Sequence, residues 1–326
     1  MLITGAGGSV GSEISRKIVE LRPRTLILLE NSEYALYKIE QELSYMNLKE
    51  QKLEVVPVLG SICDNELLNF IRQKYEIDII YHTASFKHVP LLEVNPIAAF
   101  QNNVLGTKNI ASLAKLSKAE QAILISTDKA VNAVSVMGKT KRIAEHLFQS
   151  AAQEVAGDTE FKIIRFGNLI GSSGSVIPLF KEQIRQGKNL TITEPEMTRY
   201  FICISEAVNL TLLSTKMSID NKVIIFDMGE PVRILDIAKK LIEESGYSVR
   251  DTKKPEGEIG IEFIGMRRGE KLHEELSFNS ELKNSEYPKI KLADEPVMSR
   301  KEVNALLEKI EKACQCRDIK TLNKLI

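Results

Sequence analysis

The sequence predicts an α/β protein: a Rossmann-type, doubly wound parallel sheet with a smaller C-terminal module. Two observations predict the sheet. Short apolar runs alternate with stretches of helical pattern over the first half of the chain, and a glycine-rich loop joins the first run to the first helical stretch. A third observation predicts the module, because this alternation loosens after Gly167, where glycines and prolines separate the remaining elements.

The elements of the sheet follow one another in a regular order. Continuous apolar runs such as residues 25–29 are typical of strands buried on both faces. We predict strands at residues 2–3, 25–29, 53–58, 77–81, 122–125 and 162–164. We predict helices at residues 12–21, 32–45, 65–74, 96–116 and 137–155. Strands joined by helices in this way form a parallel sheet covered on both faces, whose ligands bind at the carboxyl ends of the strands.

The first predicted strand is short. Leu2 and Ile3 reach Thr4 and Gly5 at once, whereas a strand normally has about 5–6 residues. Either this strand is short, or residues that precede Met1 in a longer protein complete it, and the sequence leaves both open.

The second half contributes one more strand and the smaller module. Residues 223–227 are predicted as a further strand of the sheet, and residues 234–246 as a helix that ends at Gly246. The remainder is predicted to be irregular. We therefore divide the chain into a Rossmann domain of residues 1–167 with a returning segment of 200–228, and a module of residues 168–199 and 229–326.

Composition and charge exclude several function classes. The 326 residues are 43% hydrophobic, and 44 basic residues balance 44 acidic ones. A net charge of zero argues against a nucleic-acid surface or a polybasic membrane surface. No apolar run reaches the ~20 residues of a membrane span, and no signal peptide is visible. We therefore expect a cytoplasmic protein that does not bind nucleic acid, located at the inner face of the membrane if the chain is part of a longer protein.

The cysteines predict neither disulfides nor a metal site. There are four, and the last two form a C-x-C without a second pair or a nearby His. We interpret all four as free thiols in a reducing compartment, and we expect no metal. The cysteines are Cys63, Cys203, Cys314 and Cys316.

The loop after the first strand has the spacing of a dinucleotide-binding turn. Gly5, Gly8 and Gly11 follow a predicted strand and open a predicted helix, which is the context that this motif requires. Such glycines allow a tight turn and a close approach of the backbone to a pyrophosphate, which the helix start attracts. The alternative is a glycine-rich turn without a ligand. The predicted cofactor contacts are Gly5, Gly7, Gly8, Ser9, Val10 and Gly11.

An acidic residue ends the second predicted strand. Glu30 follows the glycine loop by about 20 residues, where a carboxylate accepts hydrogen bonds from ribose hydroxyls and repels a 2′-phosphate. The next residues are Asn31 and Ser32 and not Arg, so the sequence favours NAD over NADP. Asn31 and Ser61 are further candidate cofactor contacts. The alternatives are a solvated Glu30 and a turn role for Ser61.

A polar segment follows the fifth predicted strand. Thr127, Asp128 and Lys129 come directly after it, and Met137 and Lys141 share one face of the next predicted helix. This segment resembles the short-chain dehydrogenase/reductase family, which carries Ser or Thr and then Tyr-x-x-x-Lys here. In that family the Lys holds the nicotinamide ribose, and its charge lowers the pKa of the Tyr. Thr127 and Lys141 match, but Met137 replaces the Tyr, and a thioether cannot move a proton.

The resemblance extends over nearly the whole chain. The sequence resembles the polysaccharide-biosynthesis branch of the extended short-chain dehydrogenases/reductases, and within it the retaining UDP-N-acetylglucosamine 4,6-dehydratases, which share the Met-x-x-x-Lys variant. This implies NAD as cofactor, a UDP-sugar bound by the smaller module, a homo-oligomer, and often a membrane region before the catalytic part. The matching segments are residues 4–11, 82–90, 102–107, 126–137, 165–168, 198–201 and 266–271.

The resemblance also implies a reaction. Members oxidise the sugar at C4 with NAD, remove the acidified C5 proton, expel the C6 hydroxyl as water, and return hydride to C6. We expect Asp128 to give a proton to the C6 hydroxyl, and Lys129 in its neutral form to take the C5 proton. The C4 hydroxyl proton goes either to Thr127 through a water or to Asp128. The alternative is a solvated Asp128–Lys129 pair at a strand end.

Further residues of the matching segments are candidate contacts. A guanidinium forks onto phosphate oxygens, so the two arginines among them are candidates for the diphosphate. Each side chain could instead form a structural ion pair, a helix cap or solvated surface. For the cofactor, the additional contacts are Ala84, Lys87, Asn103 and Lys141. For the substrate they are Lys87, His88, Asn168, Arg199, Arg268 and Glu270.

Two other functions are weighed against the dehydratase. A UDP-sugar 4-epimerase shares the fold and the C4 oxidation, but it returns hydride to C4, requires a Tyr at position 137 and needs no Asp–Lys pair. A non-catalytic dinucleotide-binding regulator would have lost its Tyr, and the intact Asp128, Lys129 and Lys141 argue against such loss. The sequence therefore favours the dehydratase.

Overall fold

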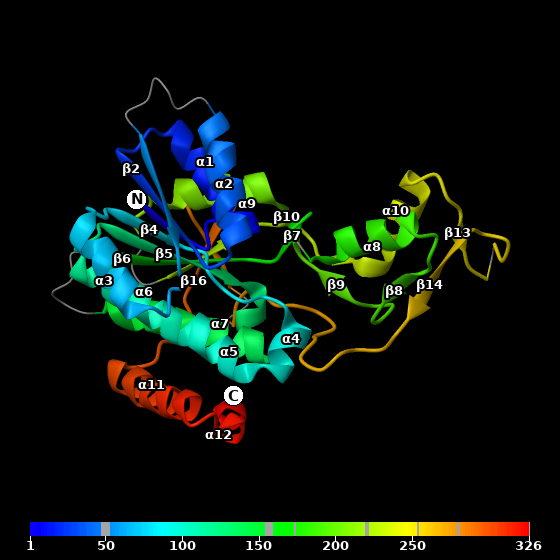
Figure 1. Ribbon diagram of the computed structural model, residues 1–326. Helices are drawn as coiled ribbons and strands as arrows, with labels where there is room; N and C mark the ends of the chain where they lie inside the picture. The colour runs from blue at the N-terminus through cyan, green and yellow to red at the C-terminus, as the bar shows by residue number, and fades with distance from the viewer. Residues whose placement is uncertain are drawn as a thin grey trace.

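The computed structural model describes residues 1–46, 53–153, 159–172, 174–218, 222–252, 254–278 and 281–325. It has two parts: a large sheet covered by helices, and a smaller group of helices and short strands beside it (Figure 1).

The large sheet has the strand order β15-β16-β11-β6-β5-β4-β1-β2-β3 in the described residues. The chain order reverses between β1 and β4, as in doubly wound sheets, which place ligands at that switch point. The predicted α/β fold is therefore confirmed, and β11 is the added strand. The parallel strands are β1 (Leu2–Thr4), β2 (Thr25–Glu30), β3 (Glu54–Leu59), β4 (Ile79–His82), β5 (Gln121–Thr127), β6 (Glu160–Phe166) and β11 (Val223–Phe226).

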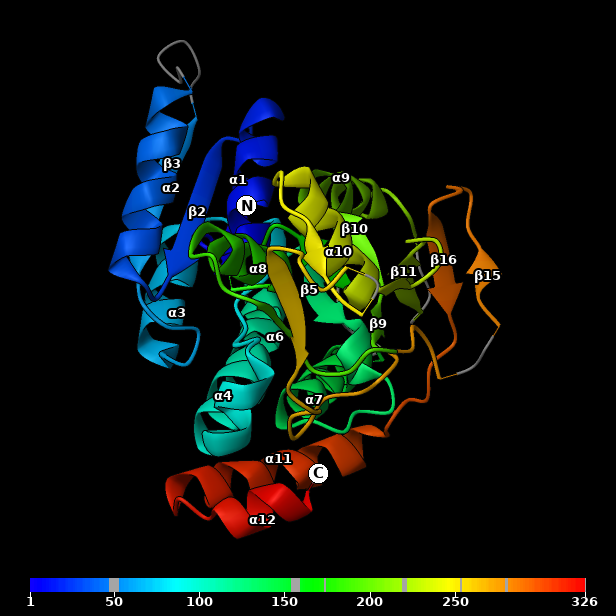
Figure 2. The ribbon, with the colours of Figure 1, turned by 90° about the vertical axis from the view of Figure 1, so that its right-hand side faces the viewer.

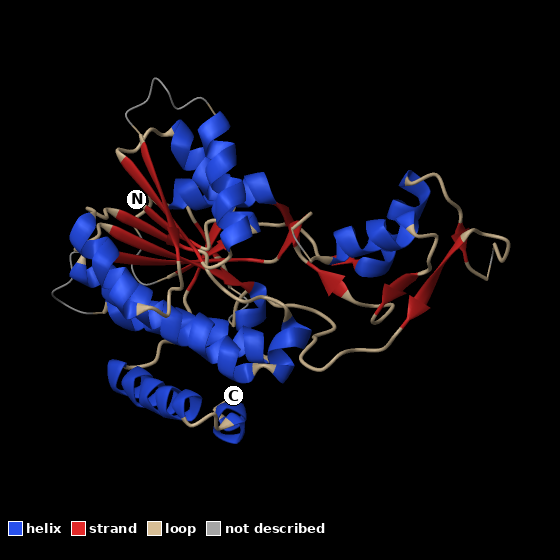
Figure 3. Cartoon of the chain, viewed as in Figure 1, coloured by secondary structure: helices blue, strands red, loops and turns tan. Residues whose placement is uncertain are grey.

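Helices cover both faces of this sheet (Figure 3). Alternate residues of a strand point to opposite faces, so Leu26 and Leu28 of β2 pack on one helix layer and Ile27 on the other. The first layer consists of α1 (Ser9–Glu20), α2 (Glu33–Tyr45) and α9 (Ile204–Ser214). The second consists of α3 (Asn65–Lys74), α6 (Gly106–Leu116) and α7 (Val136–Ala152).

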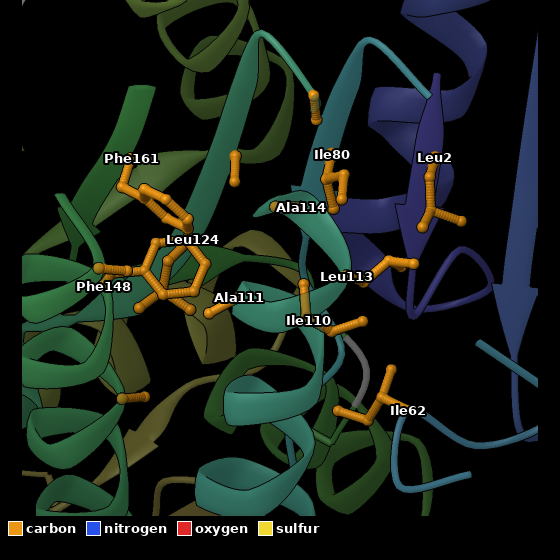
Figure 4. Close-up of a cluster of buried hydrophobic side chains, with 14 of the residues drawn as sticks. Leu2, Ile62, Ile80, Ile110, Ala111, Leu113, Ala114, Leu124, Phe148 and Phe161 are labelled. Atoms are coloured by element: carbon orange, nitrogen blue, oxygen red, sulfur yellow. The ribbon is translucent and has the colours of Figure 1, made fainter. Parts of the chain in front are cut away.

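The core beneath α6 and α7 holds these helices against the strands. Figure 4 shows Leu113 of α6 directed toward Leu2 of β1, and both side chains are buried. Phe148 of α7 packs edge-to-face on Phe161 of β6, with ring centroids 5.3 Å apart. Burying each such side chain contributes about 1.5–3 kcal/mol to stability, and this packing fixes α7 against the sheet.

The predicted helix at residues 96–116 is interrupted by a π-helical turn. The wider turn carries the buried Asn103. Its side-chain oxygen accepts a hydrogen bond from the Phe86 N–H, and its side-chain nitrogen donates one to the Phe86 carbonyl oxygen. The predicted end of the next helix, at Val155, lies outside the described residues, and α7 ends at Ala152. The chain here forms α4 (Val89–Val94), α5 (Pro96–Phe100), η2 (Gln101–Leu105) and α6.

The smaller group of elements has a core of its own, which corrects the prediction of an irregular module. Phe180, Ile192 and Ile242 are buried between a three-stranded parallel sheet and two helices. The elements are α8 (Val176–Arg185), β8 (Leu190–Ile192), α10 (Ile234–Glu244), β13 (Val249–Arg250) and β14 (Ile259–Phe263). Between them and the large sheet lie two pairs, β7 (Asn168–Ile170) with β10 (Phe201–Cys203) and β9 (Thr198–Arg199) with β12 (Val232–Arg233).

The last part of the chain returns to the large sheet, so the prediction that all of residues 229–326 belong to the smaller module is wrong for these elements. β16 (Ile290–Ala293) pairs antiparallel with β11, and β15 (Lys283–Asn284) pairs antiparallel with β16. α11 (Arg300–Gln315) and α12 (Ile319–Lys324) pack beneath α5 and α7 (Figure 2). The physical reason is an apolar stripe on α11, with Val303, Leu307 and Ile310 buried against this layer.

None of the described helices combines the length and the apolar composition that crossing a membrane requires. Within the described ranges, no group of three or more His, Cys, Asp or Glu side chains could hold a metal ion. The four cysteines are free thiols, of which Cys314 alone is buried.

Candidate active site

Two adjoining cavities open at the carboxyl ends of the parallel strands. The larger has a volume of about 720 Å³ and the smaller about 180 Å³. Gly8, Thr83, Ser85 and Phe86 line both cavities, and we call this adjoining pair the channel. The channel runs over the ends of β1 and β4, the switch point at which doubly wound sheets bind ligands.

The glycine loop between β1 and α1 forms one wall of the channel. Gly5 has a φ of +67°, and a Cβ there would lie 2.7 Å from the Cα of Ala84, so only glycine fits. A Cβ on Gly11 would lie 2.1 Å from the carbonyl oxygen of Gly5. α1 starts without a side-chain cap, so its first turn directs the positive end of the helix dipole at the cavity. The predicted contacts that line the channel are Gly5, Gly8, Ser9, Val10 and Gly11.

Glu30 lies at the end of β2 in the wall of the smaller cavity, beside Asn31. Its carboxylate accepts hydrogen bonds from the N–H groups of Gly7 (3.0 Å), Asn31 (2.9 Å) and Ser32 (3.0 Å). These bonds fix the carboxylate and leave lone-pair capacity for a further donor. Gly7 lies outside the walls and acts through Glu30; a Cβ on it would meet the Ala35 side chain at 2.5 Å.

Two predicted cofactor contacts do not line the channel. Ser61 has the turn role, because its Oγ accepts a hydrogen bond from the N–H of Cys63 at 3.1 Å. The Asn103 amide nitrogen donates to the Phe86 carbonyl and to Thr140 Oγ1, both at 3.0 Å, and its oxygen accepts from the Phe86 N–H at 2.8 Å. Asn103 therefore braces the loop after β4 and has no amide N–H left to offer a ligand.

His82 fixes the strand ends behind this loop. Its ring lies 2.8 Å from Thr4 Oγ1 and 2.9 Å from Thr107 Oγ1, so it ties β1 and β4 to α6. Burial lowers the pKa of His82 to about 3, and the ring is neutral at ordinary pH. The following Thr83 and Ala84 are thereby held in the channel wall.

The polar segment after β5 forms a hydrogen-bonded cluster at the larger cavity. Thr127, Lys129 and Asn168 line the cavity, and the fully buried Asp128 lies in contact with the first two. Asp128 Oδ1 accepts hydrogen bonds from Thr127 Oγ1 and Lys129 Nζ, both at 2.9 Å. Lys129 Nζ also donates to Asn168 Oδ1 at 3.1 Å. The structure thus brings together four of the residues predicted for catalysis and substrate binding.

The second oxygen of Asp128 is buried and has no hydrogen-bond partner among the described residues. A Cβ on Gly167 would lie 3.2 Å from this Oδ2, so the glycine leaves the carboxylate its space. A buried anionic oxygen without a donor is costly, and a proton bound there would remove that cost. Oδ2 therefore keeps its full acceptor capacity within the described part of the cluster.

α7 places Met137 and Lys141 one turn apart on the wall of the larger cavity. Lys141 Nζ is buried and donates to the carbonyl oxygen of Ile125 at 2.7 Å. Burial lowers the pKa of Lys141 to about 8, although the Glu145 charge opposes this. Met137 occupies the position of the family's Tyr, so the cavity has no phenol there.

Lys87 and His88, which were predicted as contacts of the cofactor or the substrate, precede α4 and line the larger cavity. Burial lowers the pKa of Lys87, and burial together with the Lys87 charge lowers that of His88. His88 packs against Gly174, where a Cβ would lie 2.5 Å from the ring Cε1. Leu91 and Leu92, which the sequence did not single out, give this wall an apolar part.

Arg199 does not line either cavity, which corrects its prediction as a phosphate partner. The residue is buried, and its guanidinium donates to the carbonyl oxygens of Thr198 (2.6 Å), Lys271 (2.9 Å) and Leu272 (3.1 Å). Backbone carbonyls of β9 and of the segment after β14 thus take three of the five donors with which Arg199 could bind a phosphate.

Arg268 and Glu270 also lie outside the cavity walls. Both belong to the exposed loop that follows β14. Arg268 Nε pairs with Glu93 Oε2 at 3.2 Å, and Glu270 accepts a hydrogen bond from the Arg267 N–H at 3.0 Å. Neither side chain lines a cavity, so the structure does not place Arg268 or Glu270 where the predicted substrate contacts would be.

A buried ion network supports β5 and β6 beneath the polar cluster. Arg165 pairs with Glu145 at 2.8 Å and with Glu295 at 2.9 Å, and all three side chains are fully buried. Burial alone would raise the pKa of Glu145, but the charges of Arg165 and Arg142 and the hydrogen bonds from Arg165 and Ser126 together outweigh it, and the pKa falls to about 2. Ser126 Oγ donates to Glu145 at 2.6 Å, so the network fixes the strand end that carries Thr127.

Glu274 completes the cluster, and the sequence did not single it out. Its Oε1 lies 3.6 Å from Lys129 Nζ and 3.8 Å from Arg199 Nε, and its side chain is only 3% exposed. Its Oε2 has no hydrogen-bond partner among the described residues. Glu274 has no signal in the sequence, because it lies far from Lys129 in the chain and only the fold brings the two side chains together.

Known proteins match most of the chain. Residues 1–295 match the family described as polysaccharide biosynthesis protein. The chain is 47% identical to the capsular polysaccharide biosynthesis protein CapD of Staphylococcus aureus, over 86% of this chain and 45% of that one. The chain spans about half the length of the first curated relatives that it matches.

Two relatives with named reactions are less similar but match over most of their own length. One is a UDP-N-acetylglucosamine 4,6-dehydratase (inverting) of Campylobacter jejuni, 31% identical over 96% of this chain and 89% of that one. The other is a UDP-glucose 4-epimerase of Rickettsia rickettsii, 32% identical over 86% of this chain and 78% of that one.

Solved structures share the fold. Pen from Bacillus thuringiensis superposes with a TM-score of 0.77 at 28% identity, over 92% of this chain and 90% of that one. DesIV from Streptomyces venezuelae, a dTDP-glucose 4,6-dehydratase solved with NAD and TYD bound, superposes with a TM-score of 0.70 at 18% identity, over 97% of each chain.

Proposed function

The chain belongs to the polysaccharide biosynthesis protein family, and we propose that it is a NAD-dependent UDP-N-acetylglucosamine 4,6-dehydratase. The product would be a UDP-4-keto-6-deoxy sugar. The observation that carries the proposal is the cluster of Thr127, Asp128 and Lys129 at the larger cavity. It offers a carboxyl group and an amine at one place, and removal of water from a sugar requires an acid and a base.

The residues of the channel fit NAD. A Cβ on Gly8 would meet only the carbonyl oxygen of Gly5, at 3.2 Å, so the helix start is open to a diphosphate. Glu30 has capacity for a ribose hydroxyl, and its charge disfavours a 2′-phosphate. Lys141 lies in the wall of the larger cavity. When bound, NAD supplies the acceptance of hydride from C4 and its return to C6.

Thr127 and Asp128 form a path for the C4 hydroxyl proton. Thr127 Oγ1 donates to Asp128 Oδ1, so a proton taken up by the Thr127 oxygen is matched by one passed to Asp128. Asp128 does not line the cavity, so it gives its proton back through the Thr127 hydroxyl, which passes one to the C6 oxygen as the C6–O bond breaks. Lys129, as a neutral amine, takes the C5 proton and later returns it to C5. Each group ends the cycle as it began.

Lys87, His88 and Asn168 are proposed contacts of the sugar and its diphosphate, because all three line the larger cavity. The cavity volume of about 720 Å³ lies within the range of about 300–1,000 Å³ typical of small-molecule sites. The apolar Leu91 and Leu92 on the same wall would exclude water from the reacting carbons.

A UDP-sugar 4-epimerase is the second candidate, favoured by the 32% identity to the Rickettsia rickettsii enzyme. An epimerase returns hydride to C4 and uses one group to exchange the proton of the C4 hydroxyl. Met137 cannot serve as that group, and the Asp128–Lys129 pair would have no elimination to perform. We therefore rank the epimerase below the dehydratase.

Incubation of the purified protein with NAD and UDP-N-acetylglucosamine separates the functions by product mass. A dehydratase yields a product that is lighter by one water molecule. An epimerase yields an isomer of equal mass, and a non-catalytic regulator leaves the substrate unchanged. Either of the last two results would reject the dehydratase.

A further inference from the structure

Glu274 lies against the proposed base, and we propose that it takes up the proton that Lys129 must release before it can act. The inference rests on the proposed dehydratase function. Glu274 Oε1 is 3.6 Å from Lys129 Nζ, and no other carboxylate among the described residues pairs with this amine except Asp128. Glu274 would be a positioning residue, since it acts through Lys129 and does not line the cavity.

The proton balance of the reaction requires such a residue. Asp128 must begin as a carboxylate to accept the C4 hydroxyl proton, and it loses that proton to the leaving C6 oxygen. Lys129 must begin as a neutral amine: the C5–H electron pair forms the C5–C6 double bond while Nζ binds the proton. Over one cycle both groups return to these starting forms. An ammonium at Lys129 therefore carries one proton too many.

The surroundings of Lys129 are those of an ammonium group. Its Nζ donates to Asp128 Oδ1 at 2.9 Å and to Asn168 Oδ1 at 3.1 Å, and it forms an ion pair with Glu274 Oε1 at 3.6 Å. Transfer of one proton from Nζ to Glu274 leaves an amine beside a carboxylic acid, without exchange of protons with solvent. Because both side chains are largely buried, this transfer also removes two charges from a region of low dielectric.

Glu274 suits this role better than Asp128. Its Oε2 is buried without a hydrogen-bond partner among the described residues, and a proton there ends the cost of an unpaired anionic oxygen. Arg199 opposes protonation, but its Nε is 3.8 Å away, and three of its other four N–H groups donate to carbonyl oxygens. Asp128 already accepts from Thr127, and a proton on it at rest would close the path from C4.

The segment that carries Glu274 is fixed independently of Lys129. Arg199 donates to the carbonyls of Lys271 and Leu272, and Lys271 Nζ donates to the Val131 carbonyl at 2.8 Å. On the other side, Arg165 donates to the Leu276 carbonyl at 2.8 Å. Replacement of the Glu274 carboxylate should therefore leave the segment in place.

Glu274→Gln tests the inference, with Glu275→Gln as matched control. Glu275 is the next residue, half exposed, and pairs with Lys271 and Asn132 outside the cluster. In Glu274→Gln, a proton passed from Lys129 to Asp128 would close the path from C4, so the productive loss of the Lys129 proton is to solvent. We expect dehydration at neutral pH to fall by about a hundredfold. The rate should then rise by about tenfold per pH unit, while wild type and Glu275→Gln stay flat over the same range.

A role limited to ion pairing predicts the opposite sign. Without a neighbouring anion, Lys129 would lose its proton more easily, so Glu274→Gln would be at least as active as wild type at neutral pH. That result would overturn the inference. A loss of activity that does not recover as pH rises would overturn it too, because it would indicate a structural defect.

Two readouts do not depend on turnover. Glu274→Gln should still oxidise C4, so reduction of quenched reactions with borodeuteride should mark a 4-keto sugar that keeps its C6 hydroxyl. Competitive acylation followed by mass spectrometry should label Lys129 less in Glu274→Gln than in Glu275→Gln, because less neutral amine is present. Equal or greater labelling would overturn the inference. If wild type itself forms no product lighter by one water, the proposed function fails, and the labelling still decides where the proton resides.

Discussion

Replacement of Asp128 by Asn tests the proton path at a single atom. The amide oxygen can still accept hydrogen bonds from Thr127 and Lys129, which now reach Oδ1 at 2.9 Å, so the cluster keeps its shape. The amide cannot carry a proton from the C4 oxygen to the C6 oxygen. A positioned acid–base group typically contributes about 10²–10⁴-fold to the rate, and Asp128 would serve in two steps. We therefore expect kcat to fall by about a thousandfold.

The assay combines product mass with calorimetric titration of NAD. Asp128 is fully buried and lies outside the cavity walls, so the NAD Kd should stay within about twofold of wild type. Asp78→Asn is the control, since Asp78 is exposed and precedes β4 at the opposite edge of the sheet. Turnover of Asp128→Asn within about tenfold of wild type would refute the proton path. Loss of NAD binding would show that Asp128 supports the fold instead.

Three further changes test the channel and its supports. Glu30→Gln removes a negative charge and one hydrogen-bond acceptor, so calorimetry should show an NAD Kd raised roughly tenfold. The preference for NAD over NADP should also become smaller. An unchanged preference would contradict the assignment of Glu30 as a ribose contact. Arg165→Met removes the buried guanidinium that pairs with both Glu145 and Glu295 and leaves Arg142 as the remaining cation beside them. Urea titration should show a loss of roughly 3–5 kcal/mol in the free energy of unfolding, and a loss below about 1 kcal/mol would argue against the network. His82 has a pKa of about 3 in the folded protein, against an ordinary value of 6.5. Between pH 3 and pH 6.5 the ring therefore binds a proton in the unfolded chain but not in the folded protein. Stability should fall as pH drops from 6.5 toward 3, and His82→Gln should weaken that dependence; identical pH curves would contradict it.

The sheet and its glycine loop could be predicted because both are local patterns. Continuous apolar runs mark strands buried on both faces, and the runs at residues 25–29 and 122–125 lie within β2 and β5. The loop from Gly5 to Gly11 is set by backbone geometry within a few residues, which glycine spacing reports directly.

The end of the chain carried a signal that our interpretation of the sequence missed. Ser299 and Glu302 form a capping box, and Val303, Leu307 and Ile310 follow at helical spacing. That combination predicts a helix where we expected irregular structure. Its place beneath α7 could not have been predicted, because it depends on the pairing of β16 with β11.

Side-chain partners at the site depend on contacts between distant segments. Arg199 has the chemistry to bind phosphate, but carbonyls of residues 271 and 272 occupy its donors. Asn103 has the chemistry to bind a cofactor, but the Phe86 backbone and Thr140 occupy its amide. Glu274 gave no signal in the sequence, because its role follows from its distance to Lys129. Residue type indicates what a side chain can do, and the fold decides with which partner.

The most direct test of the proposed dehydratase follows one hydrogen atom. UDP-N-acetylglucosamine labelled with deuterium at C4 is converted by the purified protein, and the product is examined by NMR. A dehydratase that returns hydride within the same site should give a 4-keto product with the deuterium at C6. Deuterium retained at C4 of an isomer, or substrate recovered unchanged, would contradict the proposed reaction.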